Sequence, residues 1–153
     1  HYLSEKHIGW LIAINGLIIF VAEMPLVKYF EQDRFSIFKI LIGSTLLFAL
    51  SFFVLNLTGW VGVLAIGMLL LTVGEMLNFP FCNSFALSRA QEGNQGEYMA
   101  LFTMTFSLAH IFGHNSGMQL IGYFGYEVTW YIMTGLLVIA SFILWRLKAI
   151  SKG

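Results

Sequence analysis

Ionisable and amide side chains are few in this sequence, and those inside long apolar runs are candidates for chemistry. Glu75 lies in such a run, and Asn78 follows three residues later, so both can share one face of a helix. A charge at membrane depth costs about 2.5–3.5 kcal/mol on insertion scales, which marks Glu75 as a functional candidate. Because desolvation disfavours a charged carboxyl group, Glu75 is predicted to carry protons. The alternative is a neutral Glu75 that holds two helices together.

Two histidines lie one helical turn apart in a second apolar run, at His110 and His114. Histidine titrates near neutral pH, so this pair is predicted to contact substrate, with His114 also relaying protons. The alternative is that both are neutral packing residues. Their spacing also suits two metal ligands, with Glu75 as a third ligand from another helix. An intramembrane metalloenzyme therefore stays as an alternative function, although no metal and no cofactor is expected.

A third apolar run contains Asn15 and Glu23, which lie within about a quarter turn of each other on a helix. We assign Asn15 to the substrate path together with Glu75, Asn78, His110 and His114. Glu23 lies beside Pro25 near the end of its run, and we assign it to proton coupling or gating rather than to substrate contact.

These side chains need membrane-spanning helices to position them. The chain has 153 residues, of which 58% are hydrophobic and 10% charged, whereas a soluble domain has about 25% charged residues. A helix that spans a bilayer needs about 20 mostly apolar residues. Five runs meet that length, at residues 8–30, 37–57, 60–87, 98–121 and 128–147. The predicted fold is therefore an all-α membrane protein with five transmembrane helices and no separate soluble domain.

Basic residues indicate how these helices are oriented. Seven of the eight Lys and Arg residues fall on one side of the predicted spans, and Lys6 falls on the other. The seven are Lys28, Arg34, Lys39, Arg89, Arg146, Lys148 and Lys152. Cytoplasmic loops are enriched in Lys and Arg, so the start of the chain is predicted outside the cell and its C-terminus in the cytoplasm. The net charge is zero, without a basic run, which gives no electrostatic basis for nucleic-acid binding.

The predicted spans also differ in polarity. The runs 37–57 and 128–147 carry no ionisable residue at membrane depth, whereas the other three hold every deep ionisable residue and amide except Asn56. Ionisable residues in membranes face protein or water, so 37–57 and 128–147 are predicted to face lipid.

Three motifs resemble the C-terminal half of a transporter of the major facilitator superfamily, of the drug:proton antiporter type. They are Gly74-Glu75-Met76 with Pro80 and Gly96-Glu97-Tyr98-Met99; Gly113-His114-Asn115-Ser116-Gly117 with Ile121-Gly122 and Gly125; and Gly9-Trp10 with Asn15-Gly16 and Pro25-Leu26. The resemblance implies that the five spans are helices eight to twelve of a twelve-helix transporter, in its six-helix C-terminal bundle. It places helices eight, ten and eleven around a central cavity. Gly113, Gly117 and Gly122 have the spacing of close helix packing.

The function that follows from this resemblance is membrane transport rather than enzyme catalysis. We expect a piece of a proton-coupled secondary transporter in a bacterial inner membrane, which exports small amphipathic molecules by alternating access. Its partners would be the bilayer, protons, a small-molecule substrate and the missing N-terminal half of the transporter. The chain starts without Met, which also suggests a piece of a longer polypeptide. A helical membrane subunit that does not transport is the remaining alternative.

Overall fold

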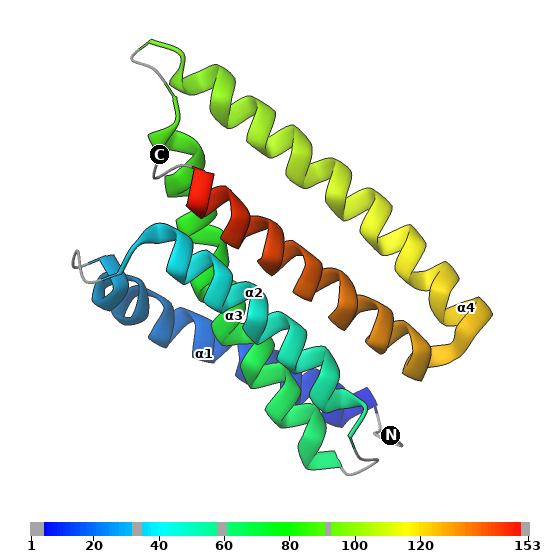
Figure 1. Cartoon of the computed structure of the whole chain (residues 1–153). Coiled ribbons are helices and arrows are strands. Elements are labelled where there is room, and N and C mark those ends of the chain that lie inside the picture. The colour runs from blue at the N-terminus through cyan, green and yellow to red at the C-terminus, as the bar shows by residue number, and fades with distance from the viewer. Residues whose placement is uncertain (1–4, 32–34, 58–60, 91–92, 151–153) are drawn as a thin grey trace.

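Four helices make up the described part of the chain, which comprises residues 5–31, 35–57, 61–90 and 93–150 of a computed structural model (Figure 1). They are α1 (Glu5–Glu31), α2 (Ile37–Leu55), α3 (Val61–Ser88) and α4 (Gln95–Ile150). Each is long and apolar enough to cross a membrane, which confirms the predicted all-α membrane protein. Residue 60, Arg34 and Lys152, which entered the predictions, lie outside the described residues.

Helix α4 contains a sharp bend at Gly125, where φ is 78° and ψ is 175°. The chain reverses there, so the two limbs of α4, residues 95–124 and 126–150, run antiparallel (Figure 1). These limbs hold the predicted spans 98–121 and 128–147, so the prediction of five separate helices is wrong by one. The physical reason is that glycine alone readily adopts positive φ with extended ψ, so a single residue replaces the expected loop.

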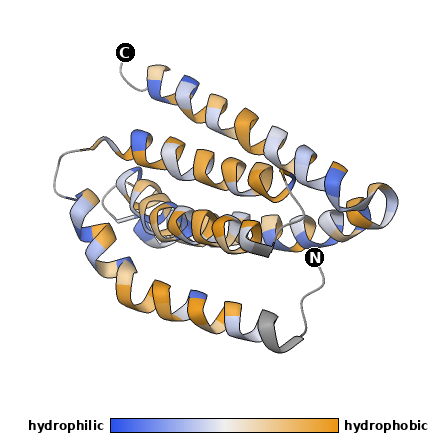
Figure 2. Ribbon diagram, turned by 90° about the horizontal axis from the view of Figure 1, so that it is seen from below, coloured by the Kyte–Doolittle hydropathy of each residue, from blue (hydrophilic) through white to orange (hydrophobic). Residues whose placement is uncertain are grey.

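The start of α1 and the end of α4 lie at opposite ends of the helix bundle (Figure 1). The start of α1 lies at the same end as the end of α2, the start of α3 and the bend within α4. The end of α4 lies at the other end, with the ends of α1 and α3. Hydrophobic residues occur along all four helices, with hydrophilic residues between them (Figure 2), and each helix contains an apolar stretch long enough to span a bilayer.

The tightest packing joins α2 to α3. A small apolar core forms there from Ile40 and Leu41 of α2 and Leu77 and Phe81 of α3. Small residues allow the two backbones to approach closely. The Ser51 hydroxyl of α2 donates a hydrogen bond to the Gly67 carbonyl of α3 at 2.8 Å. The hydrophobic effect does not draw helices together in lipid. Hydrogen bonds between helices stabilise their packing instead.

Helix α2 also packs against the second limb of α4. The Asn56 side chain donates a hydrogen bond to the Glu127 carbonyl at 3.0 Å, and the Phe52 and Trp130 rings stack with centroids 5.4 Å apart. Helix α2 therefore lies between α3 and the second limb of α4.

This position adds detail to the predicted sorting of helices, in which spans 37–57 and 128–147 face lipid. Helix α2 (predicted span 37–57) does not simply face lipid, because its buried residues include Ser44, Thr45 and Ser51. Its exposed apolar stripe is limited to Leu46, Leu50 and Phe53. By contrast, α1 and the first limb of α4 are mostly exposed. The prediction used ionisable and amide residues and did not consider the small hydroxyl residues that are buried on α2.

Candidate functional site

Glu75 lies on α3 between the contacts that α3 makes with two other helices. One turn before it, the fully buried Thr72 donates a hydrogen bond to the Asn15 side-chain oxygen of α1. One turn after it, the Phe79 ring meets Phe106 of α4 edge to face, with centroids 5.6 Å apart. Residues spaced by three and four share a helix face, so Glu75 lies on the face that joins these two contacts.

The Glu75 carboxyl group is partly buried and forms no hydrogen bond or ion pair with another described residue. The alternative in which Glu75 holds two helices together therefore gains no support from the described chain.

His110 lies at the level of Glu75 on the neighbouring helix. Its ring is tilted against that of Phe106, with centroids 6.0 Å apart. Helix α3 and the first limb of α4 run antiparallel (Figure 1). Glu75, one turn before Phe79, therefore lies at the same height as His110, one turn after Phe106. His114 lies one turn further along α4, and both imidazoles are exposed. The aromatic contact thus brings His110, rather than His114, to the height of Glu75.

Asn78 lies in the α2–α3 interface. Its amide nitrogen donates to the Ser44 hydroxyl at 3.0 Å, and its amide oxygen accepts a hydrogen bond from the Cys82 thiol at 3.3 Å. Ser44 is completely buried and donates in turn to the Leu41 carbonyl at 3.0 Å. With both ends of its amide engaged, Asn78 is a packing residue in this structure, which gives its assignment to the substrate path no support.

The remaining polar candidates lie on α1. Asn15 is partly buried and bridges α1 to α3 through Thr72. Glu23 is also partly buried, about two turns further on, and has no hydrogen bond or ion pair to another described residue. The structure thus brings Asn15 to the α3 face that carries Glu75, whereas Glu23 joins no cluster there.

The glycines that make close contacts differ from those predicted. A Cβ built on Gly113 or Gly122 meets no atom within 4 Å, and on Gly117 it meets only the Met133 methyl carbon at 3.8 Å. The packing role of these three stays a prediction. Close approach occurs instead on α3, where a Cβ on Gly67 or Gly74 lies 3.0 or 2.9 Å from a side chain of α2.

A metal centre has no ligand set among the described residues. No three His, Cys, Asp or Glu side chains of that part of the chain gather as a group that could hold a metal ion. His110, His114 and Glu75 therefore do not form the three-ligand site that the metalloenzyme alternative needs.

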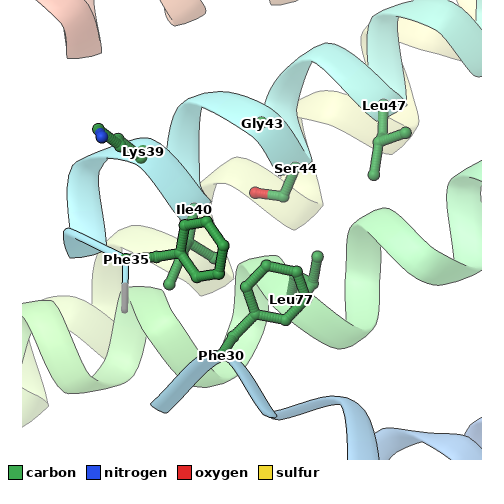
Figure 3. Close-up of a pocket in the computed structure, with 8 residues that line it drawn as sticks. All are labelled: Phe30, Phe35, Lys39, Ile40, Gly43, Ser44, Leu47 and Leu77. Atoms are coloured by element: carbon green, nitrogen blue, oxygen red, sulfur yellow. The ribbon is translucent and has the colours of Figure 1, made fainter. Parts of the chain in front are cut away.

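A groove with a volume of about 450 Å³ lies between α1, α2 and α3 and was not predicted from the sequence (Figure 3). Phe30, Phe35 and Leu77 line it, with Lys39 and Gly43 on the α2 side, and none of the predicted site residues is among its lining. The signal available in the sequence was the pair of aromatic residues, Phe30 and Phe35, on either side of a charged stretch, followed by Lys39.

Comparison with known proteins agrees with the resemblance at the level of the superfamily. The family model described as Major Facilitator Superfamily matches residues 1–152. No curated protein and no solved structure matches the chain.

Proposed function

The chain belongs to the major facilitator superfamily, whose members are membrane transporters rather than enzymes, and we propose that it forms part of a proton-coupled secondary transporter. In this proposal the chain supplies helices eight to twelve, and the transporter exports small amphipathic molecules from the cytoplasm. We further propose a bacterial inner membrane, with the start of the chain outside and its C-terminus in the cytoplasm, from the distribution of Lys and Arg.

The observation that carries this proposal is the environment of Glu75. Its carboxyl group is half-buried in a membrane-spanning helix, and no described residue pairs with it. Ionisable residues in transmembrane segments commonly mark ion pathways and proton relays. A carboxyl group that no protein partner holds in one charge state is suited to bind and release a proton during each cycle.

The surroundings of Glu75 suit an amphipathic substrate. Phe79 and Phe106 supply apolar ring surface next to it, and His110 supplies a polar group at the same height. Protonation of Glu75 would remove a negative charge from this face. The deprotonated state would therefore favour a cationic substrate, and the protonated state an apolar one. Alternating access would then expose this face to each side in turn.

The proposal is tested with Glu75→Gln in the full-length transporter that contains this chain. Glutamine keeps the size of the side chain but cannot exchange a proton, so proton-driven transport in proteoliposomes is expected to be lost while substrate binding stays measurable. Glu97→Gln is the matched control, because Glu97 is exposed in the first turn of α4. Undiminished transport by Glu75→Gln would refute proton coupling at this residue. Absence of transport by the unmodified protein would favour the non-transporting subunit.

A further inference from the structure

The groove between α1, α2 and α3 is separate from the face that carries Glu75. The Phe30 and Phe35 rings lie with centroids 5.3 Å apart and converge with Ile40 and Leu77 on one side of it (Figure 3). Gly43 leaves the α2 side open, because a Cβ built there meets no atom within 4 Å. The groove is thus an apolar channel along the surface of a membrane-spanning helix.

A positive charge lies at one end of this channel. Lys39 is exposed in the first turn of α2, lines the groove, and has no hydrogen bond or ion pair from its side chain to another described residue. The first turn of α2 contains no acidic residue, and the Ser36 side chain does not cap it. No acidic side chain in this turn therefore offsets the positive charge of Lys39, and the positive end of the α2 helix dipole adds to it. An anion beside Lys39 would be stabilised by both.

The dimensions of the groove select the kind of molecule that fits. Lys39 and Leu47 both line it and are eight residues apart, which at 1.5 Å per residue is about 12 Å along α2. A helix about 10 Å across would fill roughly 900 Å³ over that length, twice the volume of about 450 Å³ that is present. An acyl chain is narrower and has the apolar character of the walls.

We propose that this groove binds an anionic phospholipid, with the phosphate at Lys39 and one acyl chain between α1, α2 and α3. The groove begins at the end of the bundle where Lys28, Lys39, Arg146 and Lys148 lie in or next to the terminal turns of their helices, and basic residues at that level attract anionic lipids. The proposal does not depend on proton coupling at Glu75, since no residue is shared between the two sites.

The test measures binding of phosphatidylglycerol and phosphatidylcholine to the purified full chain by native mass spectrometry. Lys39→Gln is expected to weaken phosphatidylglycerol binding about five-fold, the equivalent of the roughly 1 kcal/mol that one basic residue near the surface contributes. Phosphatidylcholine binding should fall by less, because its choline cation offsets the charge of the phosphate. Lys28→Gln is the matched control, because Lys28 is exposed in the last turn of α1 and does not line the groove.

A second pair of variants tests the acyl-chain part of the site. Gly43→Leu places a side chain in the groove and should reduce the amount of both lipids bound. Gly135→Leu is its control, because Gly135 is also exposed with no atom within 4 Å of an added Cβ, but lies on the second limb of α4. Circular dichroism confirms that all variants keep their helix content.

Three results would overturn the proposal. Lys39→Gln and Lys28→Gln could have equal effects, which would mean that lipids bind by general surface charge. Gly43→Leu and Gly135→Leu could have equal effects, which would mean that no lipid enters the groove. Displacement of phosphatidylglycerol by a transported substrate would show that the groove holds substrate instead.

Discussion

Gly74→Ala tests the glycine of the described chain at which an added Cβ would lie closest to a neighbouring helix. A Cβ at Gly74 would lie 2.9 Å from both Cδ1 and Cε1 of Phe48 and 3.3 Å from the Ser44 carbonyl oxygen. Carbon atoms attract best at about 3.5–4.0 Å, so this methyl group is repelled. Overpacking of this kind costs about 1–3 kcal/mol, whereas alanine gains about 0.5–1 kcal/mol over glycine inside a helix. The net expectation is a loss of about 1 kcal/mol in the free energy of unfolding.

The control for this prediction is Gly135→Ala. A Cβ at Gly135 meets no atom within 4 Å, so this variant gains the helix preference without the clash. The difference between the two variants then isolates the overpacking cost, which is expected to be about 1–3 kcal/mol. Reversible unfolding in mixed micelles of mild detergent and dodecyl sulfate measures both values.

A second substitution identifies the origin of the clash. Phe48→Leu removes the ring atoms nearest to Gly74, so adding it to Gly74→Ala should recover part of the lost stability, visible as a coupling free energy in a double-mutant cycle. Recovery should be incomplete because the Ser44 carbonyl oxygen belongs to the backbone of α2. The reasoning fails if Gly74→Ala and Gly135→Ala are equally stable, since the Phe48 ring would then move aside without cost.

Two further substitutions test the bend and the contact between α1 and α3. Gly125→Ala is expected to lower the free energy of unfolding by about 1–3 kcal/mol, because Gly125 has a φ of 78° and a ψ of 175°. Gly122→Ala, in the helix before the bend, should not lower it. Equal unfolding midpoints of the two variants would contradict this expectation. Thr72→Val removes the hydrogen bond to Asn15 and should cost about 0.6 kcal/mol, the average for such bonds in membranes. Thr103→Val, where the hydroxyl bonds only its own helix, is its control, and an equal loss in both would argue against an interhelical role.

The helices were predictable from the sequence because hydrocarbon thickness fixes the length of an apolar run. The predicted span 37–57 and the observed α2 (Ile37–Leu55) differ by two residues at one end. The bend at Gly125 was not predictable in this way. Gly122 and Gly125 are the same residue type three positions apart, and composition does not indicate which one adopts positive φ.

The candidate site was predictable only in part. The spacing of Glu75 and Asn78 placed both on one face, but three residues advance a helix by 300°, which leaves about 60° between their side chains. Asn78 follows Thr72 by six residues and so lies about 120° around the helix from it, which turns Asn78 toward Ser44 of α2, while Glu75 lies between the two directions. Which helix is adjacent in each direction depends on tertiary packing, and that information is absent from spacing.

The packing of α2 also bears on how the proposed transporter would move. Helices α2 and α3 approach closely at Gly67 and Gly74, and the Ser51 hydroxyl bonds across the same interface. Close packing of this kind resists sliding, because a shift along the axis drives side chains into the opposing backbone. In the other direction, α3 meets α1 and the first limb of α4 through the Thr72 hydrogen bond and the Phe79 ring contact. We therefore expect the contacts on either side of Glu75, rather than the glycine interface, to change during a transport cycle.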